Sequence, residues 1–190
     1  VRNAELGWGV ATVDEPPRPG TTLEALTALK TPFRPAGRVT AGNAAGLNDG
    51  ATAALLASES KAKELGLAPK AKMVTFAFAG VEPEIMGYGP VPSTLKALSK
   101  AGLSIEDIGL FEINEAFAMV TMLAMQSHGL DHERVNVHGG ACAQGHPIGS
   151  TGSRIIVTLM HALHHYGKAR GIAALCIGGG EATAVAIEMC

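Results

Sequence analysis

The stretch from Val137 to Gly152, VHGGACAQGHPIGSTG, constrains the fold of this chain more than any other. It holds five glycines in sixteen residues, with the pair His146 and Pro147 in its middle. Glycine is used where the backbone must bend into positive φ or approach another group closely. Because an apolar run at helical spacing follows, the stretch predicts a tight loop that leads into a helix, with Pro147 near the first turn. A proline disfavours α conformation in the preceding residue, so we expect His146 on the loop, beside the start of a buried helix.

Composition narrows the classes of protein to which the chain can belong. Lys and Arg total 15 against 17 acidic residues, and aromatic residues make up only 4%, which argues against nucleic-acid binding. No apolar run approaches the roughly 20 residues of a membrane span, and the first twenty residues lack the pattern of a signal peptide. Three cysteines, an odd number, argue against a disulfide framework and for a reducing compartment, so we expect a cytoplasmic location. The start lacks a methionine and is rich in proline, which is typical of a fragment.

The first seventy residues contain few periodic elements. The pattern predicts a short helix over 23–29 and a boundary rich in glycine and asparagine over 35–50. Residues 51–57, ATAALLA, favour a helix by propensity, but their small side chains also suit a strand between packed layers. A second short helix is expected over 58–65, ended by Gly66.

From residue 72 onward the predicted order of elements is β-α-β-α-β-α-β-β. The strands are expected at 72–79, 108–113, 134–137, 171–177 and 183–188, with a long loop over 80–92. Such alternation predicts an α/β fold, here a mixed five-stranded sheet covered by helices on both faces. Sites in sheets of this kind gather at the carboxyl ends of strands. Three loops directly follow predicted strands, at 114–115, 139–149 and 176–180, and we expect the functional site where they converge.

His146 is the first candidate for chemistry. A lone histidine is often structural, and the chain has seven. The glycines around His146 and its position between loop and helix favour a functional role. An imidazole with a pKa of roughly 6.5 suits a general base or a donor to an oxyanion.

Cys176 ends an apolar strand and precedes three glycines. Cys176 has two possible roles. It is either a buried cysteine that acts as a small hydrophobic residue, or a thiol that faces backbone N–H groups able to stabilise a developing negative charge. Cys142 and Cys190 are weaker candidates. Asn114 either caps a helix or holds a water or a carbonyl, and Glu115 suits the positive end of that helix.

The other histidines and the glycine patterns do not indicate a metal site or a nucleotide site. His138, Cys142 and His146 lie four residues apart, but the glycines between them argue against the helix on which that spacing would align metal ligands, so we expect no metal site. The histidines near residue 165 suit the C-terminal end of a helix. Neither a dinucleotide-binding nor a P-loop motif occurs in the right context.

With these residues identified, the chain resembles the thiolase family, which comprises acetyl-CoA acetyltransferases and 3-ketoacyl-CoA thiolases. The resemblance covers nearly the whole chain and follows the family's order of motifs. The matching motifs are AGNAAGLNDGA at 41–51, GPVPSTLKAL at 89–98, EINEAFA at 112–118, NVHGGACAQGHPIGSTGSR at 136–154 and CIGGG at 176–180. The resemblance implies an acyl-CoA C-acyltransferase that makes or cleaves 3-ketoacyl-CoA such as acetoacetyl-CoA, with coenzyme A or acetyl-CoA as substrate and no permanently bound cofactor.

The resemblance also implies roles for four catalytic groups. His146 would activate a nucleophilic cysteine and contribute to a first oxyanion hole, in which Asn114 would hold a water. Cys176 would be the acid/base that moves a proton on the acetyl α-carbon. The backbone N–H of Gly178 would form part of a second oxyanion hole. This division fits the chemistry, since a Claisen condensation needs one nucleophile, one base and two stabilised carbonyl oxygens.

Five further positions are implied to bind substrate. Met86 and Phe117 would line the acyl pocket, Phe33 the pantetheine channel, and Arg18 would lie near the nucleotide of coenzyme A. Ala45 stands where many members carry a serine that touches coenzyme A, so one hydrogen bond worth about 1 kcal/mol would be missing.

The family's nucleophilic cysteine lies in an N-terminal half that has no counterpart here. The resemblance therefore divides the chain into the tail of a loop domain (1–49), the last strand and helix of an N-terminal domain (50–71) and a C-terminal domain (72–190), with 51–57 as a strand. It implies an N-terminal half, on the same or a separate chain, as partner, and a homodimer or homotetramer. One alternative is an inactive half that binds coenzyme A or serves in assembly. Another is a ketoacyl synthase, a related family that typically uses two histidines, but the motif CIGGG with Cys176 argues against it.

Overall fold

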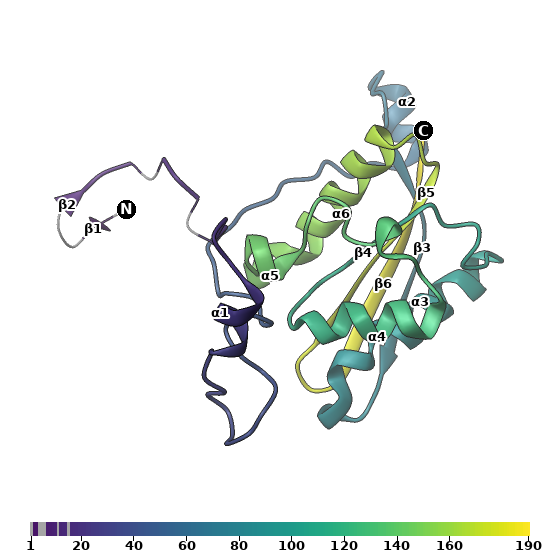
Figure 1. The fold of residues 1–190 in the computed structure, drawn as a ribbon. Coiled ribbons are helices and arrows are strands. Elements are labelled where there is room, and N and C mark those ends of the chain that lie inside the picture. The colour runs from purple at the N-terminus through teal and green to yellow at the C-terminus, as the bar shows by residue number, and fades with distance from the viewer. Residues whose placement is uncertain (1, 4–6, 11, 15) are drawn as a thin grey trace.

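A four-stranded mixed sheet forms the centre of the fold in the computed structural model, which describes residues 2–3, 7–10, 12–14 and 16–190 (Figure 1). Its strands are β3 (Ala71–Gly80), β4 (Leu110–Ile113), β5 (Arg170–Ile177) and β6 (Glu181–Met189), in the order β3-β6-β5-β4. β4 runs parallel to β5, whereas β6 is antiparallel to both of its neighbours. The sheet is therefore mixed, as the sequence predicts.

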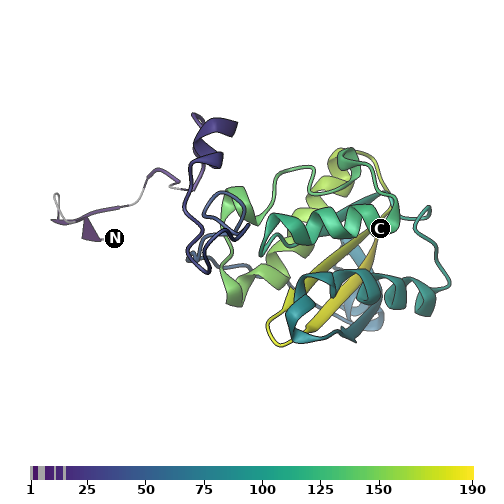
Figure 2. The ribbon, with the colours of Figure 1, turned by 60° about the horizontal axis from the view of Figure 1, so that its bottom comes forward.

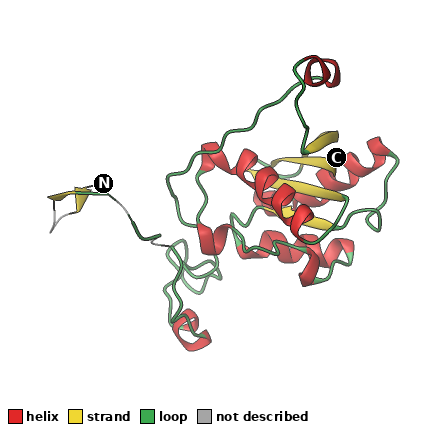
Figure 3. Ribbon diagram, turned by 90° about the horizontal axis from the view of Figure 1, so that it is seen from above, coloured by secondary structure: helices red, strands yellow, loops and turns green. Residues whose placement is uncertain are grey.

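Helices cover both faces of this sheet (Figures 2 and 3). On one face α3 (Pro90–Ala101) and α4 (Ala118–His128) pack over a buried cluster that includes Ile172, Ala174 and Cys176 of β5. On the other face α6 (Ile148–His165) packs over a second cluster that includes Ala173. Alternate residues of β5 thus face opposite helices, as the period of a strand requires. The predicted α/β class is confirmed, and no helix in the described ranges is long and apolar enough to cross a membrane.

The predicted fifth strand, 134–137, is wrong. Residues His132–Arg134 form a 3-10 turn, and the only ladder contact there is a single parallel bridge between Phe111 and Val135. Asn136 has a positive φ of 49° and leaves the extended conformation. Its side-chain amide then accepts from Ile113 N at 2.8 Å and donates to Ile113 O at 2.9 Å. A side chain, rather than a fifth strand, therefore pairs with the end of β4.

Several predicted boundaries shift by a few residues. α3 begins at Pro90, and the expected long loop over 80–92 contains a 3-10 helix, Pro83–Tyr88. α4 begins at Ala118 with Phe117 as its N-cap, so Asn114 does not cap it. The C-cap of α4 is Gly129, whose φ of 65° is the left-handed conformation typical of glycine at a helix end. The loop before α6 contains a short helix, α5 (Ala141–Gln144), that the sequence does not predict. Pro147 lies at the N-cap position of α6, beside the first turn where the sequence predicts it.

The N-terminal part of the chain has little regular structure and extends away from the sheet (Figure 1). It contains the two-residue strands β1 (Arg2–Asn3) and β2 (Gly7–Trp8), and the helices α1 (Leu23–Thr27) and α2 (Glu59–Glu64). The strand expected over 51–57 is wrong for this structure, since these residues pair with no strand among the described residues and are mostly exposed. A strand needs a neighbour for its backbone hydrogen bonds, and none lies beside this stretch.

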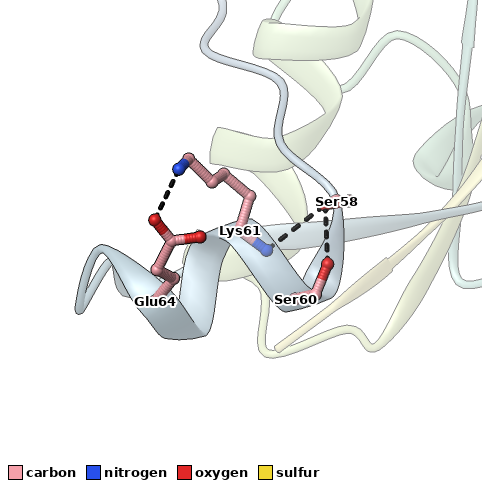
Figure 4. Close-up of polar contacts among 4 residues, drawn as sticks. All are labelled: Ser58, Ser60, Lys61 and Glu64. Atoms are coloured by element: carbon pink, nitrogen blue, oxygen red, sulfur yellow. Dashed lines mark hydrogen bonds and ion pairs between the residues drawn. The ribbon is translucent and has the colours of Figure 1, made fainter.

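The helix α2 ends the N-terminal part and is stabilised locally (Figure 4). The Ser58 hydroxyl caps it by accepting from Lys61 N at 3.2 Å and also contacts Ser60 Oγ at 3.1 Å. Lys61 Nζ pairs with Glu64 at 2.6 Å. The predicted helix over 58–65 is therefore confirmed, with a capping serine at its start.

Candidate active site

Asn114 and His146 meet at the carboxyl end of β4. The backbone N–H of Asn114 donates to Ala174 O at 2.9 Å and so extends the ladder between β4 and β5 by one residue. Its side chain is 1% exposed, and its Nδ2 atom lies 3.5 Å from His146 Nε2. Residues 32 positions apart in sequence thus bring an amide and an imidazole together, which joins two of the three loops that were predicted to converge.

The loop that carries His146 is fixed by residues distant in sequence. The backbone N–H of His146 donates to Gly46 O at 2.9 Å and contacts Asn48 Oδ1 at 3.3 Å. Gly145, with a φ of 96°, is required there because a Cβ atom would lie 2.1 Å from Asn48 Oδ1. On the other side, His146 Nδ1 lies 2.7 Å from Thr151 Oγ1 in the first turns of α6. Both ring nitrogens and the backbone of His146 therefore have partners.

The electrostatic surroundings keep this imidazole neutral. Burial lowers the pKa of His146 from its ordinary value, and the positive charge of Arg154 lowers it further. A neutral imidazole retains the lone pair that a general base needs at neutral pH.

Buried polar side chains lie on the side of β4 that faces α6, where Leu110 packs. Glu112 is 2% exposed, and burial raises its pKa to about 7, with the charge of Arg154 opposing and that of Glu115 assisting the rise. Glu112 Oε1, Asn114 Oδ1 and both terminal nitrogens of Arg154 are buried without a hydrogen-bond partner among the described residues. Unpaired buried polar atoms are rare and mark places where a water or a ligand atom can bind.

Glu115 holds the glycine-rich loop against the sheet. Its carboxylate accepts from Asn136 Nδ2 and from the backbone N–H of Cys142, each at 3.0 Å. A Cβ atom on Gly140 would lie 2.3 Å from this carboxyl carbon, so glycine is needed for the close approach. Sequence reasoning placed Glu115 at a helix start, whereas the structure shows it bracing the loop.

Cys176 lies near the end of β5 on the sheet face covered by α3 and α4. It is 6% exposed, and burial raises the pKa of its thiol. Met86 and Phe117 pack against the same buried cluster, so two predicted pocket residues share its surroundings. Gly178 follows in the exposed turn between β5 and β6. No hydrogen bond in the described part of the chain joins Cys176 to His146.

The remaining predicted binding positions divide into two groups. Ala45 lies at the site, because its N–H donates to Ala116 O at 3.1 Å, beside Phe117. Phe33 is 77% exposed and lines a small hollow of about 220 Å³ together with Arg34. Arg18 is also exposed. A second, larger hollow lies next to Pro147, and neither Arg18 nor Phe33 lines it.

That larger hollow, of about 310 Å³, opens where residues 48–52 cross the start of α6. Thr52 Oγ1 and Ser150 Oγ form a hydrogen bond of 2.8 Å across its wall. Its lining is mainly polar: Asn48, Asp49, Gly50, Ala51, Thr52, Pro147, Ile148, Gly149, Ser150 and Ser153.

The other candidate groups do not form a second centre. Cys142 contacts Glu115 O at 3.7 Å, and burial together with the Glu115 charge raises its pKa to about 11. The His138 ring packs instead against His165 and Tyr166, with centroids 5.8 and 5.7 Å away. Among the described residues, no three His, Cys, Asp or Glu side chains gather as metal ligands would.

Sequence reasoning missed several residues that build this site. Asn48 and Thr151 hold His146, while Glu112 and Arg154 set the charge beneath it. Thr151 had a signal, since a hydroxyl in the first turns of a helix can reach back to the loop that precedes it. Asn48 had none, because its contact spans 98 residues.

Comparison with known proteins identifies the family. The family model described as "Thiolase, C-terminal domain" matches residues 67–189, and "Thiolase, N-terminal domain" matches residues 3–60. The chain is 52% identical to an acetyl-CoA acetyltransferase of Allochromatium vinosum over 179 residues, which cover 94% of this chain and 45% of the relative.

Two solved structures share the fold. A Bacillus anthracis acetyl-CoA acetyltransferase is 51% identical with a TM-score of 0.90, covering 93% of this chain and 45% of the other. A human mitochondrial 3-ketoacyl-CoA thiolase in complex with CoA is 43% identical with a TM-score of 0.86, covering 94% and 45%. The chain spans about half the length of the relatives it matches. It belongs to the thiolase family.

Proposed function

We propose that this chain carries the catalytic loops of an acyl-CoA C-acyltransferase that condenses acyl-CoA thioesters or cleaves 3-ketoacyl-CoA such as acetoacetyl-CoA. The observation that carries the proposal is the pairing of the His146 imidazole with the Asn114 amide at the start of α6. Membership of the thiolase family supports it, as does the coenzyme A bound to a related human enzyme. Coenzyme A and its acyl thioesters are proposed as substrates, with no permanently bound cofactor.

In the cleavage direction, a cysteine thiolate supplied by the N-terminal half adds to the 3-keto carbon of the substrate. His146 takes the proton of that thiol at Nε2, and Asn114 with its water stabilises the oxyanion. The bond between C2 and C3 then breaks, and its electron pair stays on C2 as the enolate of acetyl-CoA. Cys176 donates a proton to C2, while the N–H of Gly178 stabilises the enolate oxygen. Free coenzyme A then gives its thiol proton to the Cys176 thiolate and attacks the acyl-enzyme thioester. Acyl-CoA leaves, and the released cysteine takes its proton back from His146, which restores all three groups.

The raised pKa of Cys176 supports its role, because burial keeps the thiol protonated and ready to donate. Met86 and Phe117, which pack near it, are proposed to line the acyl pocket. Ala45 is proposed to face coenzyme A, and Phe33 and Arg18 to contact its pantetheine and nucleotide parts.

Division of the chain follows the same proposal: 1–49 as the tail of a loop domain, 50–71 as the end of an N-terminal domain, and 72–190 as the C-terminal domain. We propose that the working enzyme is a cytoplasmic homodimer or homotetramer in fatty acid metabolism. Three free cysteines are typical of a reducing compartment.

An inactive coenzyme A-binding or assembly half is the second candidate. The state of the cysteines favours it, because burial raises the pKa of Cys142 and of Cys176 and suppresses the thiolate form of both. A chain with no activated thiol of its own would bind substrate without turning it over.

Thiolysis of acetoacetyl-CoA, followed by loss of its enolate absorbance, separates the two. The 190-residue chain is assayed alone and together with the part of the Bacillus anthracis relative that this chain does not cover. We expect no turnover alone and turnover after addition, abolished by His146→Ala. Binding of coenzyme A without turnover in the mixture would support the second candidate, and turnover by the chain alone would overturn the assignment of roles.

A further inference from the structure

The hydroxyl of Thr151 lies between two partners. Its Oγ1 atom is 3.0 Å from Pro147 O, one helical turn earlier, and 2.7 Å from His146 Nδ1. A threonine hydroxyl has a single hydrogen to donate but can accept a second hydrogen bond. A carbonyl oxygen can only accept, and Pro147 O already accepts from the backbone N–H groups of Ser150 and Thr151, each at 2.8 Å. Because a threonine hydroxyl inside a helix typically donates to the carbonyl one turn earlier, the geometry favours Pro147 O as the acceptor of the hydroxyl hydrogen as well.

This assignment determines which ring nitrogen of His146 carries the proton. If Thr151 donates to Pro147 O, its oxygen must accept from His146 Nδ1–H. In the neutral ring the proton is then on Nδ1, and Nε2 carries the lone pair. Which ring nitrogen of a histidine is protonated is set by the hydrogen bond that the other nitrogen makes.

The contact on the opposite side of the ring fits the same arrangement. Asn114 Nδ2, which can only donate, lies 3.5 Å from His146 Nε2. The opposite tautomer would place Oγ1 and Pro147 O 3.0 Å apart with no hydrogen between them. It would also need the Asn114 amide turned over, since Nε2–H and Nδ2–H cannot pair.

We infer that Thr151 is a positioning residue, which holds His146 as the Nδ1–H tautomer and leaves Nε2 free to take a proton beside Asn114. Thr151 itself touches neither of the proposed reacting atoms. It acts through the ring of His146, whose backbone is fixed separately by Gly46 and Asn48. The assignment of the tautomer stands on geometry alone, and only its kinetic consequence rests on the proposed function.

The direct test is the ¹⁵N chemical shift of the two ring nitrogens of His146, measured at pH 8 on the histidine-labelled 190-residue chain. A His146→Gln variant identifies its signals among those of the seven histidines. We expect a protonated Nδ1 and an unprotonated Nε2. A protonated Nε2 in the wild-type chain would overturn the inference, whether or not any variant folds.

Two substitutions separate the hydroxyl from the rest of the side chain. Thr151→Ser keeps the hydroxyl, and we expect the wild-type tautomer. Thr151→Val keeps the shape but removes the acceptor, and we expect the proton to move at least partly to Nε2. An unchanged tautomer in Thr151→Val would contradict the inference. Thr27→Val is the matched control, because Thr27 Oγ1 makes the same contact, to Leu23 O at 2.8 Å, in α1.

The kinetic test uses the reconstituted acyltransferase. We expect Thr151→Val to lower kcat about 100-fold, the lower end of what general acid–base catalysis contributes, while Thr151→Ser and Thr27→Val retain most of the rate. An equal loss in Thr151→Ser and Thr151→Val would show that packing, not the hydroxyl, matters, and would overturn the role. If the wild-type mixture shows no thiolysis, the proposed function fails, whereas the nitrogen shifts still decide the tautomer.

Discussion

Two parts of this molecule differ in how their structure is held. The sheet domain, residues 71–190, buries two apolar clusters on opposite faces of one sheet. The N-terminal segment, residues 16–58, has one short helix and leaves leucines such as Leu55 83% exposed. Among the described residues of that segment, only those over 43–52 form hydrogen bonds with the sheet domain, and we name them the anchor stretch. The sheet domain is therefore held by its own core, and the segment by contacts with the active-site loops.

The anchor stretch shows what these contacts achieve. Asn43 O accepts from Ala118 N at 2.9 Å, and Ala45 N donates to Ala116 O at 3.1 Å, at the start of α4. Further along, Gly46 and Asn48 hold the backbone of His146, and Gly50 is pressed against Pro147. The anchor stretch thus orders the two loops that carry Asn114 and His146. The apolar clusters of the sheet domain stabilise the fold, whereas the anchor stretch positions the active-site loops.

Leu159→Ala is expected to have the largest effect. Leu159 is fully buried in α6 against Gly171, so truncation should leave a cavity and lower the free energy of unfolding by about 4 kcal/mol. Leu55→Ala, the same change in the N-terminal segment, should alter it by less than about 0.5 kcal/mol. Urea unfolding followed by circular dichroism measures both. Similar losses in the two variants would mean that the segment has a core of its own.

Gly145→Ala should detach the anchor stretch from the loop of His146. The added Cβ would lie 2.1 Å from Asn48 Oδ1, in a backbone with a φ of 96°. We expect a loss of about 3 kcal/mol from strain and displacement, together with faster amide hydrogen exchange over residues 43–52.

Gly129→Ala is the matched control, because it also has a positive φ, of 65°, but nothing lies within 4 Å of its Cβ position. It should cost only about 1 kcal/mol and leave hydrogen exchange in the anchor stretch unchanged. Equal exchange in the two variants would show that Asn48 does not tie this stretch to the loop.

Glu112→Gln should change how stability depends on pH. Because the pKa of Glu112 is raised from 4.5 to about 7, the folded chain binds more protons than the unfolded chain between these pH values. The stabilising contribution of Glu112 is complete below pH 4.5 and is lost as the pH rises to about 7. The glutamine variant should therefore be more stable than wild type at pH 8, by roughly 3 kcal/mol, and nearly equal to it at pH 4.5.

Glu24→Gln supplies the comparison in the N-terminal segment. Glu24 is exposed on α1, and hydrogen bonds from the backbone and from Thr22 lower its pKa. Replacing it should bring no gain of stability at pH 8. Thermal melts at the two pH values test the pair, and a pH 8 gain for Glu24→Gln as large as that for Glu112→Gln would argue against burial as the cause.

Alkylation of the cysteines is expected to have the smallest effect on the structure, and the order of modification ranks the reactivity of the three thiols. Cys190 is exposed at the chain end, whereas burial raises the pKa of Cys176 and, together with Glu115, that of Cys142. We expect iodoacetamide to modify Cys190 first, as read by peptide mass spectrometry at pH 8. Fastest modification of Cys142 would mark it as an activated thiol and reverse the proposed roles.

Much of the sheet domain could be predicted from local sequence. Glycines around His146 and the apolar run after Pro147 indicated a loop leading into a helix. The loops at 114–115 and 176–180 lie at strand ends as predicted, whereas the loop at 139–149 follows a 3-10 turn and not a strand. These signals are local, because glycine, proline and periodicity act within a few residues.

The rest depended on contacts that no local pattern reports. The fifth strand failed because the Asn136 side chain, rather than a backbone, pairs with Ile113. The contact of Asn48 with His146 joins residues 98 positions apart. Residues 51–57 favour a helix by propensity, and the small side chains that would suit a packed strand lack a neighbouring strand, which composition cannot supply.

The central claim is that the loops at the carboxyl ends of β4 and β5 form a working acyl-CoA site. The most direct measurement is exchange of the acetyl hydrogens of acetyl-CoA with D₂O, catalysed by the 190-residue chain and followed by mass spectrometry. Cys176 as the base would remove a proton from the acetyl carbon and return a deuteron from solvent, with no nucleophilic cysteine required. We expect exchange in the wild-type chain and in Cys142→Ala, and its loss in Cys176→Ala. Exchange at the same rate in Cys176→Ala, or none in the wild-type chain, would contradict the account.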